Sequence, residues 1–154
     1  MNNDEGSYTN AFRHTLWQAK ITSSFNSDIA RAAGNAHEKN PYTNTDWNFN
    51  AVLFTDINKV DEMVDIMNNI IGRSIGGESS DMDMKDLSSK ILDHFKVNGL
   101  WAANEVKNEK GEVIGYKISR TQLTQTQYES AKRNLDILDN DGFTQNENEV
   151  RNRR

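Results

Sequence analysis

Apolar residues recur at helical spacing along most of this chain. The first such segment runs over about residues 9–23, with Phe12, Leu16 and Ala19 on one stripe. The second begins at Ser27, which we expect to act as an N-cap. Its apolar face follows the i, i+3, i+4, i+7, i+8 pattern and ends in a histidine. That face consists of Ile29, Ala32, Ala33, Ala36 and His37.

A third helix is expected over about residues 58–74, with five apolar residues on its core-facing side. Gly72, Gly76 and Gly77 mark its expected end. Pro41 cannot continue the second helix, so a polar loop should separate the second helix from the third. The core-facing residues of the third helix are Val60, Met63, Val64, Met67 and Ile71.

The second half of the sequence predicts two shorter helices and a hairpin. Residues 86–97 and 124–138 have helical apolar spacing, whereas residues 100–119 alternate as the two arms of a hairpin do. Residues 139–154 are polar, and we expect this tail to fray. No repeat or long linker divides the sequence. It therefore predicts one mainly α domain over residues 1–154, a helical bundle of about five helices with one appended β-hairpin.

Composition narrows the function without assigning it. The 154 residues carry a formal net charge of −5, which provides no bulk field to attract nucleic acid or an anionic membrane. Cysteine is absent, so disulfides and thiolate catalysis are excluded. No apolar run approaches the roughly 20 residues that span a bilayer. The first residues lack the basic start and apolar stretch of a signal peptide, and we expect the chain to be a domain of a longer protein.

Two histidines stand within the predicted helices, where aliphatic residues are usual. His14 shares a helix face with Trp17, and it is either a core-edge histidine bonded to backbone or a catalytic group. His37 ends the alanine face of the second helix, where each ring nitrogen would need a partner. Glu38 follows about 100° further around the helix and need not face the same way. Both histidines are candidates for acid–base catalysis.

A ladder of polar residues runs along the third predicted helix. Asp65, Asn69 and Arg73 are spaced i, i+4, i+8, so they stack on one side of it. One interpretation is a solvated face that stabilises the helix through opposite charges. Against that interpretation, the pair Asn68 and Asn69 is unfavourable in the middle of a helix. In addition, Gly72 would let another backbone or a ligand come close.

Together these residues have the composition of a hydrolytic site. A histidine or a carboxylate would act as general base, and an arginine would bind an anionic group. A divalent metal is compatible with histidine and carboxylate ligands, but the spacing does not require one, so the cofactor stays open. We expect His14, His37, Glu38 and Asp65 to be catalytic, and Arg13, Trp17, Asn68, Asn69 and Arg73 to bind substrate.

Three motifs within residues 9–77 give the chain a resemblance to a known family. The first motif holds Asn10, Ala11, Arg13, His14 and Trp17, the second holds Ala36, His37 and Glu38, and the third holds Asp65, Asn68, Asn69, Gly72 and Arg73. In these motifs the chain resembles a domain family found at the C-terminal ends of Rhs/WapA-type bacterial polymorphic toxins and in some other secreted proteins.

The resemblance implies a toxin domain that is secreted, or delivered into a target cell, as part of a larger carrier polypeptide. A cognate immunity protein would neutralise it in the producing cell. The resemblance supplies no reaction. From the residues, the preferred interpretation is a hydrolase acting on a phosphoester or a cell-envelope substrate, where Glu38 and Asp65 could flank a glycosidic bond. The alternative is a non-enzymatic toxin or binding domain in which the polar residues form a structural hydrogen-bond network.

Overall fold

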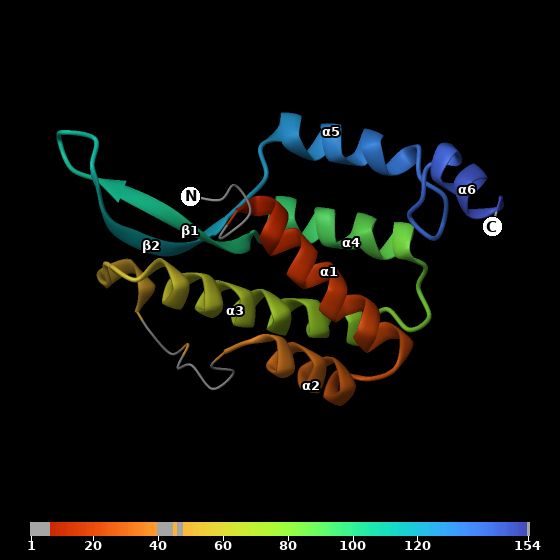
Figure 1. The fold of residues 1–154 in the computed structure, drawn as a ribbon, viewed down its shortest axis with the longest axis horizontal. Helices are drawn as coiled ribbons and strands as arrows, with labels where there is room; N and C mark the ends of the chain where they lie inside the picture. Colours follow the sequence, from red (N-terminus) through yellow and green to blue (C-terminus); the bar gives the residue numbers. More distant parts are fainter. Residues whose placement is uncertain (1–6, 40–44, 46–47, 154) are drawn as a thin grey trace.

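The computed structural model describes residues 7–39, 45 and 48–153, so most of the predicted loop after the second helix lies outside the described residues. Within them, six α-helices and one antiparallel hairpin confirm the expected mainly α fold with an appended hairpin (Figure 1). None of these helices is both long and apolar enough to cross a membrane. The elements are α1 (Tyr8–Ser24), α2 (Ser27–His37), the short 3-10 helix η1 (Phe49–Ala51), α3 (Ile57–Gly77), α4 (Met84–Val97), β1 (Leu100–Lys107), β2 (Val113–Thr121), α5 (Gln125–Asp136) and α6 (Gln145–Arg151).

Two glycines of α3 let this helix pack directly against the backbone of α1. A Cβ at Gly72 would lie 2.3 Å from the carbonyl oxygen of Thr15, and one at Gly76 would lie 2.3 Å from that of Ala19. A methyl group at either position would therefore push the two helices apart. The close approach expected at Gly72 is confirmed, and the partner is a backbone. The expectation that these glycines mark the end of the helix is wrong for Gly72 and Gly76, which lie inside α3, and right for Gly77, its last residue.

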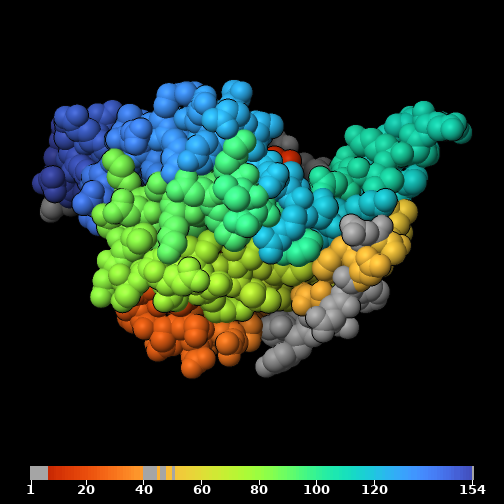
Figure 2. All heavy atoms as spheres, turned by 180° about the vertical axis from the view of Figure 1, so that it is seen from behind, coloured from red at the N-terminus to blue at the C-terminus, as the bar shows by residue number. Residues whose placement is uncertain are grey.

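Two groups of buried apolar side chains form the core. The first group joins α1 and α3 to α4, which contributes Leu87, Ile91 and Phe95. The second group lies between α3 and the hairpin and includes Ile118 of β2. All five apolar residues that the sequence assigned to the core face of α3 are buried. The tip of the hairpin projects beyond the helical body, as both views show (Figure 2).

A buried asparagine attaches the hairpin to α3. The side chain of Asn68 donates to the carbonyl oxygen of Trp101 and accepts from its backbone N–H, each over 2.9 Å. Asn68 is fully buried, and both the nitrogen and the oxygen of its side-chain amide form hydrogen bonds with this one residue of β1. The asparagine therefore fixes the position of the strand along the helix.

The face that α2 buries differs from the one expected. Ala30 and Gly34 are buried, whereas Ile29 and His37 are exposed. A Cβ at Gly34 would lie 2.9 Å from Nε2 of Gln18 on α1. The small size of the residues, rather than their hydrophobicity, therefore decides which side of α2 packs on α1.

Side-chain caps set two helix ends that the sequence analysis placed differently. Asn26, and not Ser27, is the N-cap of α2, and its side chain accepts hydrogen bonds from two backbone amides of the first turn. Near the C-terminus, α6 forms where a fraying tail was expected. Thr144 and Glu147 satisfy each other's backbone N–H groups there in a capping box.

Candidate functional site

Three side chains from three segments meet beside the contact between α1 and α3. His14 comes from α1, Asp65 comes from α3, and Glu38 directly follows α2. One nitrogen or oxygen atom of each lies within 4.8 Å of those of the other two. His14 Nε2 is 3.3 Å from Asp65 Oδ2, and both residues are only 6% exposed. We call His14, Glu38 and Asp65 the acid–histidine centre.

Regular pairing between α1 and α3 explains how two of these side chains meet. Hydrogen-bonded pairs recur at every turn, and the partners are separated by 55 residues in each case. The two helices therefore run side by side in the same direction, with one polar side of each facing the other. The solvated-face interpretation of the polar ladder is wrong, because its first two members are buried. The pairs are Asn10 with Asp65, His14 with Asn69, and Gln18 with Arg73.

Neighbouring polar groups orient the carboxyl group of Asp65. Nδ2 of Asn10 donates to Asp65 Oδ1 over 3.0 Å, and the guanidinium of Arg13 donates to Oδ1 of Asn10 over 2.7 Å. Arg13 therefore holds Asn10, which in turn holds Asp65. This chain of hydrogen bonds leaves Oδ2 of Asp65 directed at the imidazole of His14.

Burial shifts the proton equilibria of the Asp65–His14 pair. Burial, together with the negative charges of Asp61 and Glu38, raises the pKa of Asp65 to about 8, although Arg13 acts in the opposite direction. Burial also lowers the pKa of His14 below its ordinary value, against the effect of its hydrogen bond with an asparagine. Because the pKa of the acid is raised and that of the imidazole is lowered, the two side chains share one titrating proton near neutral pH.

Glu38 is the third and least satisfied member of the centre. Burial, together with the negative charges of the neighbouring Glu62 and Asp61, raises its pKa to about 7. Its Oε1 atom is buried and has no hydrogen-bond partner among the described residues. A buried carboxyl oxygen without a hydrogen-bond partner lowers the stability of the fold. Carboxyl groups of this kind are typical of sites that bind a ligand or a substrate.

Two hollows reach the centre from outside. One has a volume of about 360 Å³, and the other, of about 340 Å³, is lined by both carboxyl groups of the centre. The exposed His37 lines both hollows, and its ring centroid lies 5.7 Å from that of His14 and 5.8 Å from that of Trp17. The centre is thus open to small molecules on two sides. The first hollow is lined by Arg13, His14, Trp17 and His37.

Three residues expected to bind substrate have other surroundings. Asn68 points to β1 and lies outside both hollows. Arg73 donates to Gln18, one turn beyond the centre, and lines neither hollow. Asn69 is 3% exposed and its Oδ1 lies 3.3 Å from Nδ1 of His14, so it positions the imidazole. Of the residues predicted to bind substrate, Arg13 and Trp17 of α1 are the ones that line a hollow.

Sequence analysis missed the role of Asn10 and the acidic wall of the second hollow. Asn10 lies three and four residues before Arg13 and His14, and this helical spacing could have placed it on their face. Asp61 and Glu62 line the second hollow one turn before Asp65. Their charges matter because Asp61 opposes ionisation of both carboxyl groups of the centre and Glu62 opposes that of Glu38.

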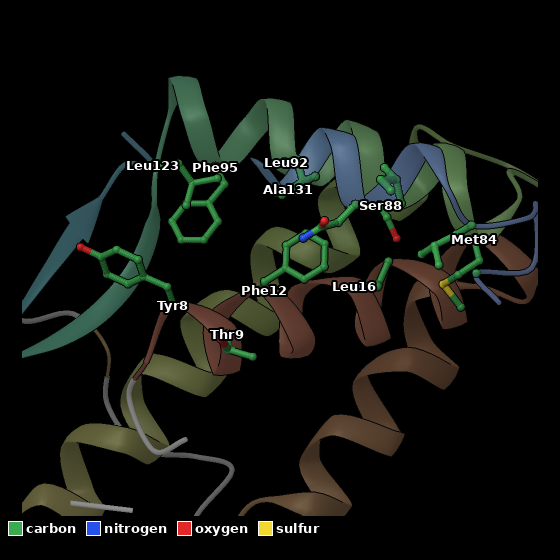
Figure 3. A pocket seen from close by; sticks show the side chains of 14 residues that line it. Tyr8, Thr9, Phe12, Leu16, Met84, Ser88, Leu92, Phe95, Leu123 and Ala131 are labelled. Carbon is green, nitrogen blue, oxygen red and sulfur yellow. The ribbon is translucent and has the colours of Figure 1, made fainter. Parts of the chain in front are cut away.

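A third, apolar hollow of about 480 Å³ lies on the other side of α1 (Figure 3). Phe12 and Leu16 of α1 face Leu92 and Phe95 of α4 across it, and α5 contributes Ala131. Its described lining has no acidic, basic or imidazole side chain. Apart from the phenol of Tyr8, its described lining offers no acid–base group, so the two hollows at the acid–histidine centre are the better candidate active site.

The described parts of residues 1–98 contain α1 to α4 and every member of the acid–histidine centre. The model of the family described as "Domain of unknown function (DUF6973)" matches this same range. The chain belongs to this family. No curated protein and no solved structure matches the chain significantly. The DUF6973 match thus includes the centre and both hollows, while the hairpin, α5 and α6 lie beyond the matched residues.

Proposed function

We propose that this chain is the effector domain of a bacterial polymorphic toxin and that it hydrolyses a phosphoester in the target cell. The observation that supports hydrolysis is the acid–histidine centre, a buried imidazole with two carboxyl groups between two open hollows. The toxin assignment rests on the three sequence motifs, which hold all three members of the centre. A carrier polypeptide and a cognate immunity protein belong to the same proposal.

The energetics of the centre favour chemistry over a purely structural role. A structural hydrogen-bond network is stabilising when each of its buried members has a partner. Here Glu38 keeps a buried oxygen without one among the described residues, and burial raises the pKa of Asp65 to about 8. Replacing such groups by apolar or amide side chains would stabilise the fold. Their presence is therefore better explained by a reaction than by packing.

The spacing of the carboxyl groups favours a phosphoester over a glycosidic bond. Glycosidases hold two carboxyl groups about 5–5.5 Å apart when they retain configuration and about 6.5–9.5 Å apart when they invert it, with the sugar between them. Oxygen atoms of Glu38 and Asp65 lie within 4.8 Å of each other and of His14. Asp65 is also only 6% exposed, so it presents little surface to a sugar ring.

Arg13, Trp17 and His37 are suited to receive the substrate. All three line the first hollow beside His14, and the guanidinium can bind a phosphate oxygen. In the proposed reaction, the oxygen of a water molecule forms a bond to phosphorus and the bond to the leaving oxygen breaks. The exposed imidazole of His37 accepts the proton of the water and returns it to the leaving oxygen. The centre holds the water in line with the phosphoester.

The proposal is tested by expressing the domain in a bacterium that lacks an immunity protein. The His37→Ala variant should stay folded, since the side chain is exposed, and should lose growth inhibition, because proton transfer contributes about 10²–10⁴-fold to rate. The matched control is His94→Ala, which changes a histidine of α4 outside both hollows. It should remain toxic. Measuring the amounts of RNA, DNA, nucleotides and envelope material over time identifies which of them is degraded first.

The non-enzymatic alternative makes a different prediction for these variants. If His37→Ala is as toxic as the unchanged protein, proton transfer by this residue is refuted. If Asn69→Ala lowers only the melting temperature and leaves toxicity per folded molecule unchanged, the polar network is structural. Loss of toxicity in both variants, with folded proteins shown by circular dichroism, supports the hydrolase.

A further inference from the structure

We propose that the acid–histidine centre binds one divalent cation of the zinc type, through Nε2 of His14 and one carboxylate oxygen from each of Glu38 and Asp65. The inference rests on the proposed function, because it names the ion through which the same site would act. In the described part of the chain, these three residues are the one group of histidine and acidic side chains whose ligand atoms lie close enough to share an ion.

Asn69 determines which nitrogen of His14 is available. Its amide oxygen faces Nδ1 at 3.3 Å, and because an amide oxygen can only accept, Nδ1 carries the hydrogen. The other nitrogen, Nε2, then presents a lone pair to Asp65 Oδ2, 3.3 Å away. Two atoms with lone pairs repel each other unless a proton or a cation lies between them.

The distance between these two atoms favours the cation. A charge-assisted hydrogen bond from nitrogen to a carboxylate normally measures about 2.7–2.9 Å. Two ligands at about 2.0–2.1 Å from a tetrahedral zinc ion lie about 3.3–3.4 Å from each other. The observed 3.3 Å between Nε2 and Oδ2 equals the separation of neighbouring zinc ligands and exceeds a strong hydrogen bond.

Glu38 supplies a third ligand from a separate segment. It follows the last residue of α2 in an extended conformation, which carries its carboxyl group back toward α3. The buried Oε1 atom has no hydrogen-bond partner among the described residues, so it is available to an ion. Three protein ligands and one position open to the hollows make the arrangement of a catalytic zinc site.

The charge around the centre also favours the binding of a cation. Five acidic side chains and two lysines line the second hollow, so its excess charge is negative. An anionic phosphoester would be repelled there. A divalent ion between Glu38 and Asp65 would neutralise both carboxylates and attract a phosphate oxygen.

The neighbours of the ligands have the roles that metal sites need. A histidine that binds a metal usually donates its second ring N–H to an oxygen, as His14 does to Asn69. A carboxylate ligand is usually held by a further hydrogen bond, as Asp65 is by Asn10. Both ligands are thus fixed before an ion arrives.

The ligand types select among ions. One imidazole and two carboxylates suit zinc, and they also suit manganese, which such a site binds more weakly. Magnesium and calcium prefer oxygen ligands alone. Bound zinc lowers the pKa of a coordinated water to about 7, so the attacking water would lose its proton to His37 near neutral pH. No electron transfer is involved, and the bonds formed and broken are those of the proposed hydrolysis.

Calorimetric titration of the tag-free protein, stripped with a chelator, tests the inference. Zinc chloride should bind with one ion per chain, manganese chloride more weakly, and magnesium chloride without detectable heat. Glu38→Gln and Asp65→Asn should each weaken zinc binding more than about 100-fold, since they remove a ligand. Asn69→Ala, which removes a support of His14, should weaken it about 10–100-fold. The control Glu62→Gln removes a nearby charge but no ligand, and should change affinity less than about tenfold.

Cobalt chloride gives a second measurement that does not depend on stability. Cobalt in a site of this size should produce visible absorption bands typical of four-coordination, and these bands should disappear in Asp65→Asn. Circular dichroism on each variant shows whether the fold is kept, so a loss of binding can be assigned to the ligand.

The results separate this inference from the proposed function. A folded protein that takes up no zinc, or takes it up equally well after Glu38→Gln and Asp65→Asn, overturns the metal site. If zinc is not bound yet His37→Ala abolishes toxicity, the result supports the proposed hydrolase and refutes the metal site. If zinc binds as expected but Glu38→Gln is fully toxic, the result supports the metal site and refutes hydrolysis at this centre.

Discussion

Replacing Asp65 by asparagine should stabilise the metal-free protein at neutral and alkaline pH. The two side chains have the same shape, so packing against α1 is kept. The asparagine oxygen can still accept from Asn10, and its NH₂ group can donate to Nε2 of His14. The substitution removes a buried carboxyl group, whose ionisation costs free energy.

The pKa of Asp65 gives the sign and the size of the effect. Its ordinary value is 3.8, and burial raises it to about 8 in the folded chain. The folded state therefore holds a proton that the unfolded state has released, and stability is lost as the pH rises through this interval. One proton corresponds to about 1.4 kcal/mol per pH unit. From pH 5 to pH 8, the stability of Asp65→Asn relative to the unchanged protein should grow by up to about 4 kcal/mol.

Urea unfolding at pH 5 and pH 8, with a chelator present, measures this difference. Asp93→Asn serves as the control without a pH dependence in this interval. Burial raises the pKa of Asp93, but hydrogen bonds from Lys132 and Tyr128 outweigh burial and lower it below its ordinary value. The carboxyl group is therefore ionised in both states at pH 5 and at pH 8, and this variant should be less stable by the same amount at both. A relative stability of Asp65→Asn that is the same at both pH values would refute the buried, protonated carboxyl group.

Three further substitutions test how the centre is assembled. Gly72→Ala should destabilise the fold by about 3 kcal/mol in urea unfolding, because its methyl group meets a carbonyl of α1. Gly77→Ala, with nothing within 4 Å, should be neutral or up to about 1 kcal/mol more stable, and an equal loss in both would contradict the close helix contact. Asn68→Ala should cost about 2–4 kcal/mol by leaving the backbone groups of Trp101 unpaired, yet should keep its toxicity per folded molecule. A folded Asn68→Ala protein that has lost its toxicity would place this residue in the functional site after all.

The elements with strong apolar periodicity could be predicted from the sequence. The helix over residues 58–74 and the hairpin over residues 100–119 agree with α3 and with β1–β2, because their repeat of large apolar residues reports directly on burial. The face of α2 could not be predicted in this way. There the contact depends on how closely Gly34 can approach Gln18, which is a property of two segments and not of one. The helix α6 was missed although Thr144 and Glu147 have the spacing of a capping box.

The candidate site could be predicted as a set of residues but not as a geometry. The motifs placed His14, Glu38 and Asp65 on separate segments, and only the packing of α1 on α3 shows that they meet. Asn68 and Asn69 are adjacent in the sequence and differ by about 100° around the helix. One fixes the hairpin and the other fixes the imidazole, and no local pattern distinguishes them.

Anomalous diffraction at the zinc edge, from crystals grown with zinc chloride, tests the central claim most directly. The claim is that three side chains from α1, α3 and the end of α2 converge on one ion. The expected result is a single strong peak about 2.0–2.2 Å from Nε2 of His14 and from one carboxylate oxygen each of Glu38 and Asp65. Zinc held only by other residues, with Glu38 turned away from the imidazole, would contradict the account.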